Sequence, residues 1–287
     1  MEYSMKELVA AAQNSTIGKA AMLAEMVETG MNEDELRKIM HDRLSVMRAS
    51  VETGMDRNLR SLSGLSGGQA ALLNDAVQAG KTVSGPLMGK AAVRAMAVAE
   101  CNACMGRIVA APTAGSCGIL PAALLTMQEE KGLSDEALVD ALFTAAAVGA
   151  VIAQRASVSG AEGGCQAECG SAAAMTAAAL VELAGGTPEM SAAACGLALM
   201  NSMGLVCDPV AGLVEVPCVY RNVVSVANAM TAADMALAGV TGPIPVDEII
   251  DAMKAVGDLL PACLRETGEG GVAACPSAMK PKKIESK

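Results

Sequence analysis

Three cysteines lie where the backbone has to turn, and they constrain the possible folds more than any other feature of the sequence. Cys165 follows two glycines, Cys207 precedes an Asp-Pro pair, and Cys218 follows a proline. Thiolates placed at turns can converge on one point, where they bind a soft metal or an iron–sulfur cluster. The C-x-x-C pairs of structural zinc sites are missing between these three cysteines. Because no fourth cysteine is obvious, such a site would leave one metal position open for chemistry.

The chain has to fill its core almost without aromatic side chains. It contains no Trp, one Phe and two Tyr, although 52% of its 287 residues are hydrophobic. Ala, Leu, Val and the twenty Met residues must supply the core, and they suit closely packed helices better than a β-sandwich. We find no alternating strand pattern, no repeat of fixed period and no low-complexity linker. The sequence therefore predicts an all-α fold, a single mainly helical domain over residues 1–287 with glycine-rich loops that converge on a metal-cluster site.

The charge balance argues against several classes of function. The net charge is −10, and an acidic chain without a basic, aromatic-laced stretch is a poor nucleic-acid binder. The N-terminus lacks the apolar core of a signal peptide, and the longest uncharged apolar run, 141–153, is shorter than the ~20 residues of a membrane span. We therefore expect a cytoplasmic protein without membrane partners, whose ten cysteines do not form disulfides. We interpret three lysines near the C-terminus as a solvated end and not as an anion site: Lys280, Lys282 and Lys283.

The spacing of apolar residues predicts helices along most of the chain. We expect amphipathic helices in 1–60, the catalytic core in 61–275 and a frayed tail in 276–287. Asn32 and Glu35 form a capping-box pattern ahead of an N-terminal helix. Further helices are expected to begin at 69 and to cover 90–107, 119–130, 134–155, 170–184, 189–203, 219–239 and 246–256.

Two glycine-rich breaks each precede a predicted helix. In the first, at 61–68, free N–H groups at the start of the next helix favour an anion such as a carboxylate. A flexible interhelix loop is the other interpretation of this segment, and on sequence alone we favour it. In the second break, at 111–118, the hydroxyls of Thr113 and Ser116 with neighbouring N–H groups are suited to hold a small polar substrate.

Most of the other reactive residues are interpreted as structural. His41 is the only histidine and lies on the charged face of a helix, so the general base has to be a Ser, Asp, Glu or Lys or belong to another chain. Lys90 lacks a phosphate cradle, so we expect no pyridoxal phosphate. We interpret the following cysteines as small core residues: Cys101, Cys104, Cys195, Cys263 and Cys169, although the spacing of the last from Cys165 could place two thiols on one helix face.

Taken in order, these segments resemble the α subunit of the iron–sulfur-dependent L-serine dehydratases. The resemblance covers nearly the whole chain and is densest at 63–68, 111–118, 162–168, 207–218 and 264–268. Long motifs in the same order make a chance agreement improbable. The sequence departs from the family after the third cysteine, where Asn-Ala-Met-Gly is replaced by Asn-Val-Val-Ser, and at positions 101 and 104, where cysteines replace smaller residues.

The resemblance implies a cofactor, a reaction and a substrate site. Cys165, Cys207 and Cys218 would ligate a [4Fe–4S] cluster and leave one iron without a protein thiolate. The implied reaction is the deamination of L-serine to pyruvate and ammonia, with the open iron as a Lewis acid on the serine hydroxyl. The two glycine-rich loops would then hold the substrate carboxylate through Ser63, Ser66, Gly67, Gly68, Thr113, Gly115 and Ser116.

The resemblance also implies a partner chain. The family occurs as a single chain in which a second domain carries a Ser-Ser-His-Thr stretch thought to bring the catalytic histidine, and this sequence has no such stretch. It is therefore expected to pair with a β subunit, in a heterodimer or a higher oligomer, that supplies the proton-transfer group. Some single-chain relatives end in a cysteine that occupies the open iron. Cys275 falls near that region, but the chain continues to Lys287, so the fourth ligand is left unassigned.

Other functions stay open on the sequence alone. The same cluster chemistry could act on threonine or cysteine, because specificity would lie in the substrate loops. A non-catalytic iron–sulfur scaffold or redox sensor would also account for ten cysteines, although an open iron and two substrate-sized loops fit catalysis better. A structural zinc protein is disfavoured by the ligand spacing.

Overall fold

The computed structural model describes residues 4–278 and confirms the all-α prediction. Within that range the chain forms no β-strand, and one isolated bridge joins Cys207 to Arg265. The three lysines interpreted as a solvated tail lie outside the described residues. The α-helices, in chain order, are α1 (Met5–Ala11), α2 (Ile17–Thr29), α3 (Glu33–Gly54), α4 (Gln69–Gln78), α5 (Gly85–Ala103), α6 (Ile119–Lys131), α7 (Asp135–Arg155), α8 (Gly160–Gly163), α9 (Ser171–Leu183), α10 (Pro188–Met200), α11 (Cys218–Leu237) and α12 (Val246–Leu259).

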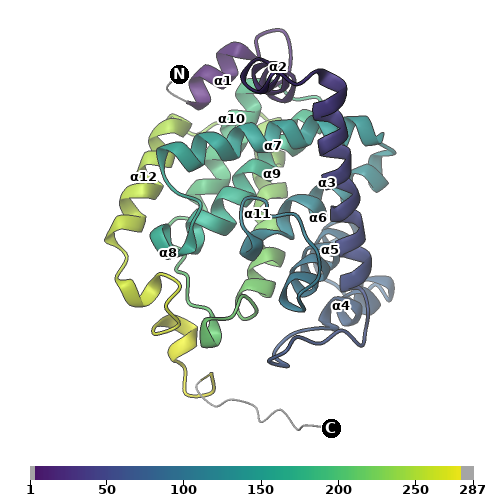
Figure 1. Cartoon of the computed structure of the whole chain (residues 1–287), viewed down its shortest axis with the longest axis vertical. Coiled ribbons are helices and arrows are strands. Elements are labelled where there is room, and N and C mark those ends of the chain that lie inside the picture. The colour runs from purple at the N-terminus through teal and green to yellow at the C-terminus, as the bar shows by residue number, and fades with distance from the viewer. Residues whose placement is uncertain (1–3, 279–287) are drawn as a thin grey trace.

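Helix α9 lies at the centre of the molecule and organises the core (Figure 1). It packs against α6, α7, α10 and α11, and every residue from Ser171 to Val181 is buried. Most of these residues are alanine, and such small side chains let the neighbouring helix backbones approach closely. The core therefore reaches close packing with almost no aromatic rings, as the sequence predicted.

The predicted N-terminal amphipathic region forms three helices. Helices α1 and α2 lie together at one end of the molecule, and α3 runs along its side (Figure 1). The predicted capping box is confirmed, because Asn32 Oδ1 accepts from the Glu35 N–H at 3.0 Å and Glu35 Oε2 accepts from the Asn32 N–H at 2.9 Å. Leu36, Met40 and Leu44 of α3 are buried, so the helix presents one apolar face to the core.

Helix α5 begins and ends earlier than the sequence predicted. We expected it over 90–107, and it spans Gly85–Ala103. The helix ends there because Met105 adopts a left-handed conformation, with φ of 63°, which does not continue an α-helix. Cys101 is a buried residue of α5, as interpreted, but Cys104 is a half-buried residue that caps the helix, and its interpretation as a core residue inside the helix was wrong.

Within the described residues, α7 is the one helix long and apolar enough to span a membrane. Its most apolar stretch is 61% buried inside the protein, where α7 packs against α2, α3 and α9. Buried core helices pass the same test of length and composition. In this structure α7 is the layer between α9 and the N-terminal helices.

Glu182, near the end of α9, ties the N-terminal helices to the core. Its Oε1 accepts from the Gly18 N–H at 3.4 Å in the first turn of α2, and the Thr144 hydroxyl of α7 donates to its Oε2. Burial raises the pKa of Glu182 to about 7, and the hydrogen bonds from the start of α2 only partly oppose this effect. The carboxyl group therefore keeps its proton in the folded protein at pH values where it is ionised in the unfolded chain.

We expect Glu182 to make the protein less stable as the pH rises. Its pKa is about 7 in the folded state against the ordinary value of 4.5, so between these values the folded state binds more protons and the free energy of unfolding falls with increasing pH. Urea unfolding at about pH 5 and about pH 8 should show a smaller pH dependence for Glu182→Gln than for the wild type. Glu130→Gln, at an exposed position of α6, serves as the control. An unchanged pH dependence in Glu182→Gln would contradict this account.

Candidate functional site

Cys165 lies at the start of a π-helical turn that leads into α9. The turn spans Gln166–Gly170, and it places the Sγ of Cys169 3.3 Å from the Sγ of Cys165. Gln166 is fully buried and fixes the turn, because its Nε2 donates to the Met253 carbonyl at 2.9 Å and its Oε1 accepts from the Gly204 N–H at 2.9 Å. π-helical turns are frequently found at functional sites, and this one was not predicted from the sequence.

Cys207 is held by the C-terminal segment on both sides of its peptide unit. Its N–H donates to the Leu264 carbonyl at 2.9 Å, and its carbonyl accepts from the Glu266 N–H at 2.7 Å. The next residue, Asp208, is buried and accepts from the Val272 N–H at 2.7 Å. The 264–268 motif therefore fixes the backbone of a candidate ligand.

Cys218 is the first residue of α11, and Asn222 one turn later connects it to the 111–118 loop. The Asn222 Nδ2 donates to the carbonyls of Cys218 at 2.9 Å and Gly115 at 2.7 Å. Its Oδ1 accepts from the Gly118 N–H at 2.8 Å. One buried amide thus sets the position of the candidate substrate loop relative to the third cysteine.

The three candidate ligands are buried and lie close enough for their charges to interact. Burial raises the pKa of Cys218 to about 12 and that of Cys207 even further, and in both cases the charge of Cys165 adds to the effect. The pKa of Cys165 is lowered, because the Cys169 thiol donates to its sulfur and the Arg221 guanidinium lies beside it. Arg221 is itself paired with Asp208 at 2.7 Å, so its charge is already partly compensated.

The donor chemistry of these thiols is compatible with a metal–sulfur group. In the part of the chain that the structure describes, no three His, Cys, Asp or Glu side chains are placed to hold one ion. A four-iron cluster is larger than an ion and holds its thiolates farther apart. Cys165, Cys207 and Cys218 form no disulfide, and their sulfur atoms are soft donors. A bound metal centre would stabilise their thiolate forms, which burial alone disfavours.

Glu168 connects the 111–118 loop to the cysteines, and sequence reasoning missed it. Its Oε1 accepts from the Thr113 hydroxyl at 2.7 Å, and its Oε2 lies 3.7 Å from the Cys207 Sγ. The carboxyl group is nine-tenths buried, and this burial raises its pKa. A Cβ at Gly160 would lie 2.6 Å from Glu168 Oε2 and 2.9 Å from Cys207 Sγ, so the glycine is required by close packing. The clue in the sequence was the acidic residue three positions after Cys165.

The hydroxyls of the 111–118 loop face each other at its turn. Thr113 Oγ1 and Ser116 Oγ are 3.1 Å apart, and the Ser116 Oγ also accepts from the Thr113 N–H at 3.4 Å. Thr113 is half-buried and Ser116 is fully buried. Gly115 lies between them, and a Cβ there would be 3.1 Å from Glu168 Oε1. This loop therefore combines polar donors, a buried carboxyl group and the ligand helix α11 in one place.

The 61–68 loop binds a carboxylate, and that carboxylate belongs to the chain itself. The fully buried Glu100 of α5 accepts from the N–H groups of Gly67 at 2.9 Å, Gln69 at 3.0 Å and Ala70 at 3.0 Å. Gly68 is the residue that caps α4. The segment is an interhelix loop between α3 and α4, as we favoured, and the N–H groups that could have bound an external anion are occupied by Glu100.

The serine hydroxyls of the same loop converge on a second internal carboxylate. The Oε2 of the buried Glu215 accepts from Ser61 at 2.7 Å, Ser63 at 2.7 Å and Ser66 at 3.1 Å. Glu215 lies three residues before Cys218, so this hydroxyl cluster joins the 61–68 loop to the loop that carries two candidate ligands. The role of Ser63, Ser66, Gly67 and Gly68 in substrate binding stays a prediction.

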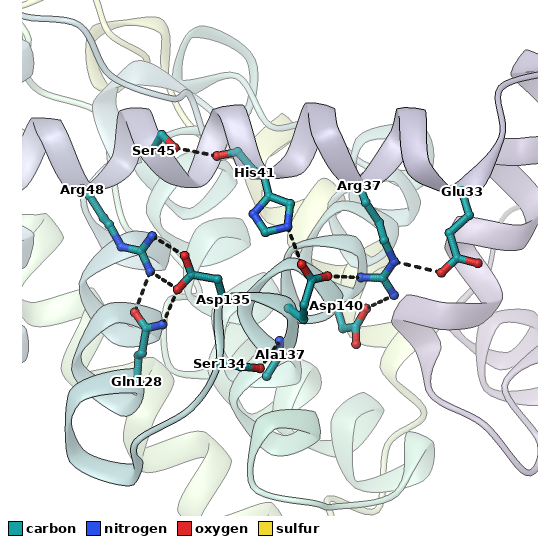
Figure 2. Close-up of polar contacts among 11 residues, drawn as sticks. Glu33, Arg37, His41, Ser45, Arg48, Gln128, Ser134, Asp135, Ala137 and Asp140 are labelled. Carbon is teal, nitrogen blue, oxygen red and sulfur yellow. Dashed lines mark hydrogen bonds and ion pairs between the residues drawn. The ribbon is translucent and has the colours of Figure 1, made fainter.

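The remaining candidates lie elsewhere. His41 hydrogen-bonds to Glu136, with 2.7 Å between its Nε2 and the Glu136 Oε1, within a network of ion pairs between α3 and α7 (Figure 2). Lys90 pairs with Glu129 at 2.6 Å on the surface. Cys195 is buried in α10 as interpreted, whereas Cys263 is only half-buried, so its interpretation as a core residue was wrong.

Comparison with known proteins points to one family. The family described as "Serine dehydratase alpha chain" matches residues 12–273. The "Probable L-serine dehydratase, alpha chain" of Bacillus subtilis is 50% identical over 276 residues, which cover 96% of this chain and 92% of that protein. The "L-serine dehydratase, alpha chain" of Peptoniphilus asaccharolyticus is 43% identical over 89% of this chain and 88% of its own length. The "L-serine dehydratase" of Streptomyces coelicolor is 38% identical over 93% of this chain but only 59% of its own length.

We expect Glu100→Ala to destabilise the protein and to loosen the 61–68 loop. Three N–H groups lose a buried, charged acceptor, which should lower the free energy of unfolding by about 2–4 kcal/mol. Urea unfolding measures the loss, and limited proteolysis should then cut within 61–70. Glu130→Ala, at an exposed position of α6, should change stability by less than about 0.5 kcal/mol. If Glu100→Ala unfolds like the wild type, Glu100 does not anchor the loop.

Proposed function

Because the chain belongs to the serine dehydratase alpha chain family, we propose that it is the α chain of a two-chain L-serine ammonia-lyase, which converts L-serine to pyruvate and ammonia. The family match over 12–273 is the observation that carries this proposal. This chain also aligns with 92% and 88% of the lengths of two relatives that are themselves named alpha chains. The catalytic part is assigned to 61–275, which contains the cysteines and both glycine-rich loops.

Cys165, Cys207 and Cys218 would hold a [4Fe–4S] cluster and leave one iron without a protein thiolate. The support is the donor set: three free, buried thiols on separately anchored turns, beside a guanidinium that is already paired. When bound, the cluster supplies a Lewis acid for the serine hydroxyl, which is otherwise a poor leaving group. Glu168 accepts a hydrogen bond from Thr113 next to these thiols and so orients the Thr113 hydroxyl.

The 111–118 loop would bind the substrate carboxylate. The Thr113 hydroxyl, which donates to Glu168 here, would turn to the substrate beside the buried Ser116, so a substrate carboxylate would compete with Glu168 for it. The backbone at Gly115 lies against Glu168 and the start of α11. The 63–68 loop would form the opposite part of the substrate site. Because the hydroxyls of Ser63 and Ser66 donate to Glu215, a substrate carboxylate would compete with Glu215 there.

The general base is assigned to a β chain. His41 lies in the ion-pair network of α3 and α7, apart from the cysteines, and it is the only histidine of the sequence. The Streptomyces coelicolor relative is much longer than the part of it that this chain matches, which supports a division of the same enzyme between two chains here. We assign the assembled enzyme to the cytoplasm.

The cluster assignment predicts how three cysteine variants behave. After anaerobic reconstitution, the wild type should contain about four irons per chain and absorb visible light as iron–sulfur proteins do. Cys165→Ala, Cys207→Ala and Cys218→Ala should each lose this iron, whereas Cys195→Ala, buried in α10, should keep it. With the β chain added, the wild type should deaminate L-serine faster than threonine or cysteine. A wild type that binds zinc or no metal would refute the assignment.

We expect Thr113→Val to weaken serine binding more than it slows the chemical step. In this structure the Thr113 hydroxyl donates its one proton to Glu168, and the proposed site requires it to turn to the substrate carboxylate when serine binds. Its loss should therefore raise the KM for L-serine by about tenfold, with a smaller change in kcat. Steady-state kinetics of the cluster-loaded two-chain enzyme measures both constants. Thr53→Val, at an exposed position of α3, is the matched control. An unchanged KM would remove Thr113 from the substrate site.

A further inference from the structure

Three exposed apolar side chains surround a hollow next to the candidate site. Leu62 is 82% exposed, Met105 is 80% exposed and Leu213 is 40% exposed. We call these three residues the apolar rim. We propose that the apolar rim is the surface on which the β chain docks, a proposal that rests on the two-chain function given above.

The hollow within the apolar rim shares residues with both glycine-rich loops of the candidate substrate site. It has a volume of about 370 Å³, and the three rim residues line it together with Ser63, Ala114 and Glu215. Ser63 belongs to the serine cluster around Glu215, and Ala114 lies between the two hydroxyls of the other loop. A partner seated here would cover both loops and could place a side chain into the hollow. The surface is therefore continuous with the site that lacks a base of its own.

The loops of the apolar rim are held in place, although they come from distant parts of the chain. The buried Glu215, two residues after Leu213, accepts hydrogen bonds from three hydroxyls of the 61–68 loop, those of Ser61, Ser63 and Ser66. Met105 follows the end of α5, and Asn102 in the last turn of α5 joins this helix end to the 111–118 loop, because its Nδ2 donates to the Ala114 carbonyl at 3.2 Å. Surfaces that are ordered before association lose less entropy on binding, so this arrangement favours a specific partner.

The backbone conformation at the apolar rim is fixed by local hydrogen bonds. Met105 has a φ of 63°, the left-handed conformation that commonly follows a helix C-cap, and the Gly106 N–H donates to the Cys101 carbonyl at 2.8 Å. This helix end holds Met105 at the surface, where its side chain is one of the most exposed large apolar side chains of the described protein.

A β chain fits this surface better than a second copy of the same chain. A second copy would cover the hollow but would bring only another His41 from its own ion-pair network. The longer Streptomyces coelicolor relative carries additional sequence on the same polypeptide, so the complementary part of the enzyme exists in relatives of this chain. The missing base and the exposed rim are then explained by the same partner.

Charged substitutions at the apolar rim test the proposal. Leu62→Asp and Met105→Asp change side chains that project into solvent, so folding should tolerate them, and thermal unfolding together with iron content verifies this. Val27→Asp is the matched control, because Val27 is 87% exposed on α2 at the opposite end of the molecule. We expect both rim variants to weaken binding of the purified β chain by about tenfold or more, as for central interface residues, and the control to bind normally. Isothermal calorimetry with cluster-loaded α chain measures these affinities.

The possible results separate this proposal from the proposed function. Rim variants that bind the β chain as tightly as the wild type, or a Val27→Asp variant that is weakened equally, would overturn the docking surface while leaving the two-chain enzyme intact. Rim variants that instead lose self-association would assign the surface to a second copy and overturn the proposal. A wild-type chain that binds no β chain would overturn both this proposal and the two-chain function.

Discussion

Buried carboxylates that accept several hydrogen bonds hold the loops of this protein together. Glu100 accepts hydrogen bonds from three backbone N–H groups at the start of α4, and Glu215 accepts hydrogen bonds from three serine hydroxyls. A carboxylate without such partners would be costly to bury, but hydrogen bonds to a charged group are about twice as strong as neutral ones. Because each carboxylate lies on a different element from its donors, the loops keep one conformation without strands to support them. The geometry of the candidate site depends on these contacts.

The small-residue core and the anchored loops depend on each other. An interior built around the alanines of α9 brings helix backbones close together, so the ends of several helices meet within a small volume. Cys218 begins α11, and Cys165 precedes the turn into α9. Both candidate ligands are therefore positioned by the helices of the core, whereas Cys207 is held by the C-terminal segment. Damage to that segment should consequently affect one ligand more than the other two.

The sequence was sufficient for features that depend on local patterns and insufficient for those that depend on distant pairings. Helical periodicity, the capping box at Asn32 and the turns at the three cysteines are local, and they were predicted. The 61–68 loop was recognised as a possible carboxylate site, but its partner Glu100 lies about thirty residues away on the face of a helix whose ends were misplaced. Glu168 was missed because it lies in a π-helical turn, and the helical spacing used to assign faces does not apply there.

The candidate site brings together acceptors and soft donors. Three thiols, Glu168 and Glu215 lie around the two loops, and the guanidinium of Arg221 is engaged with Asp208. Such a set of groups would favour positive charge, as the proposed metal–sulfur core and the ammonium group of an amino acid would supply. Removal of a Cα proton requires a base that remains unprotonated near neutral pH, and the buried carboxyl Glu168 is already used to orient Thr113. The proposed division of the enzyme between two chains fits this chemistry, because a second chain could bring the base and close the site against water in one step.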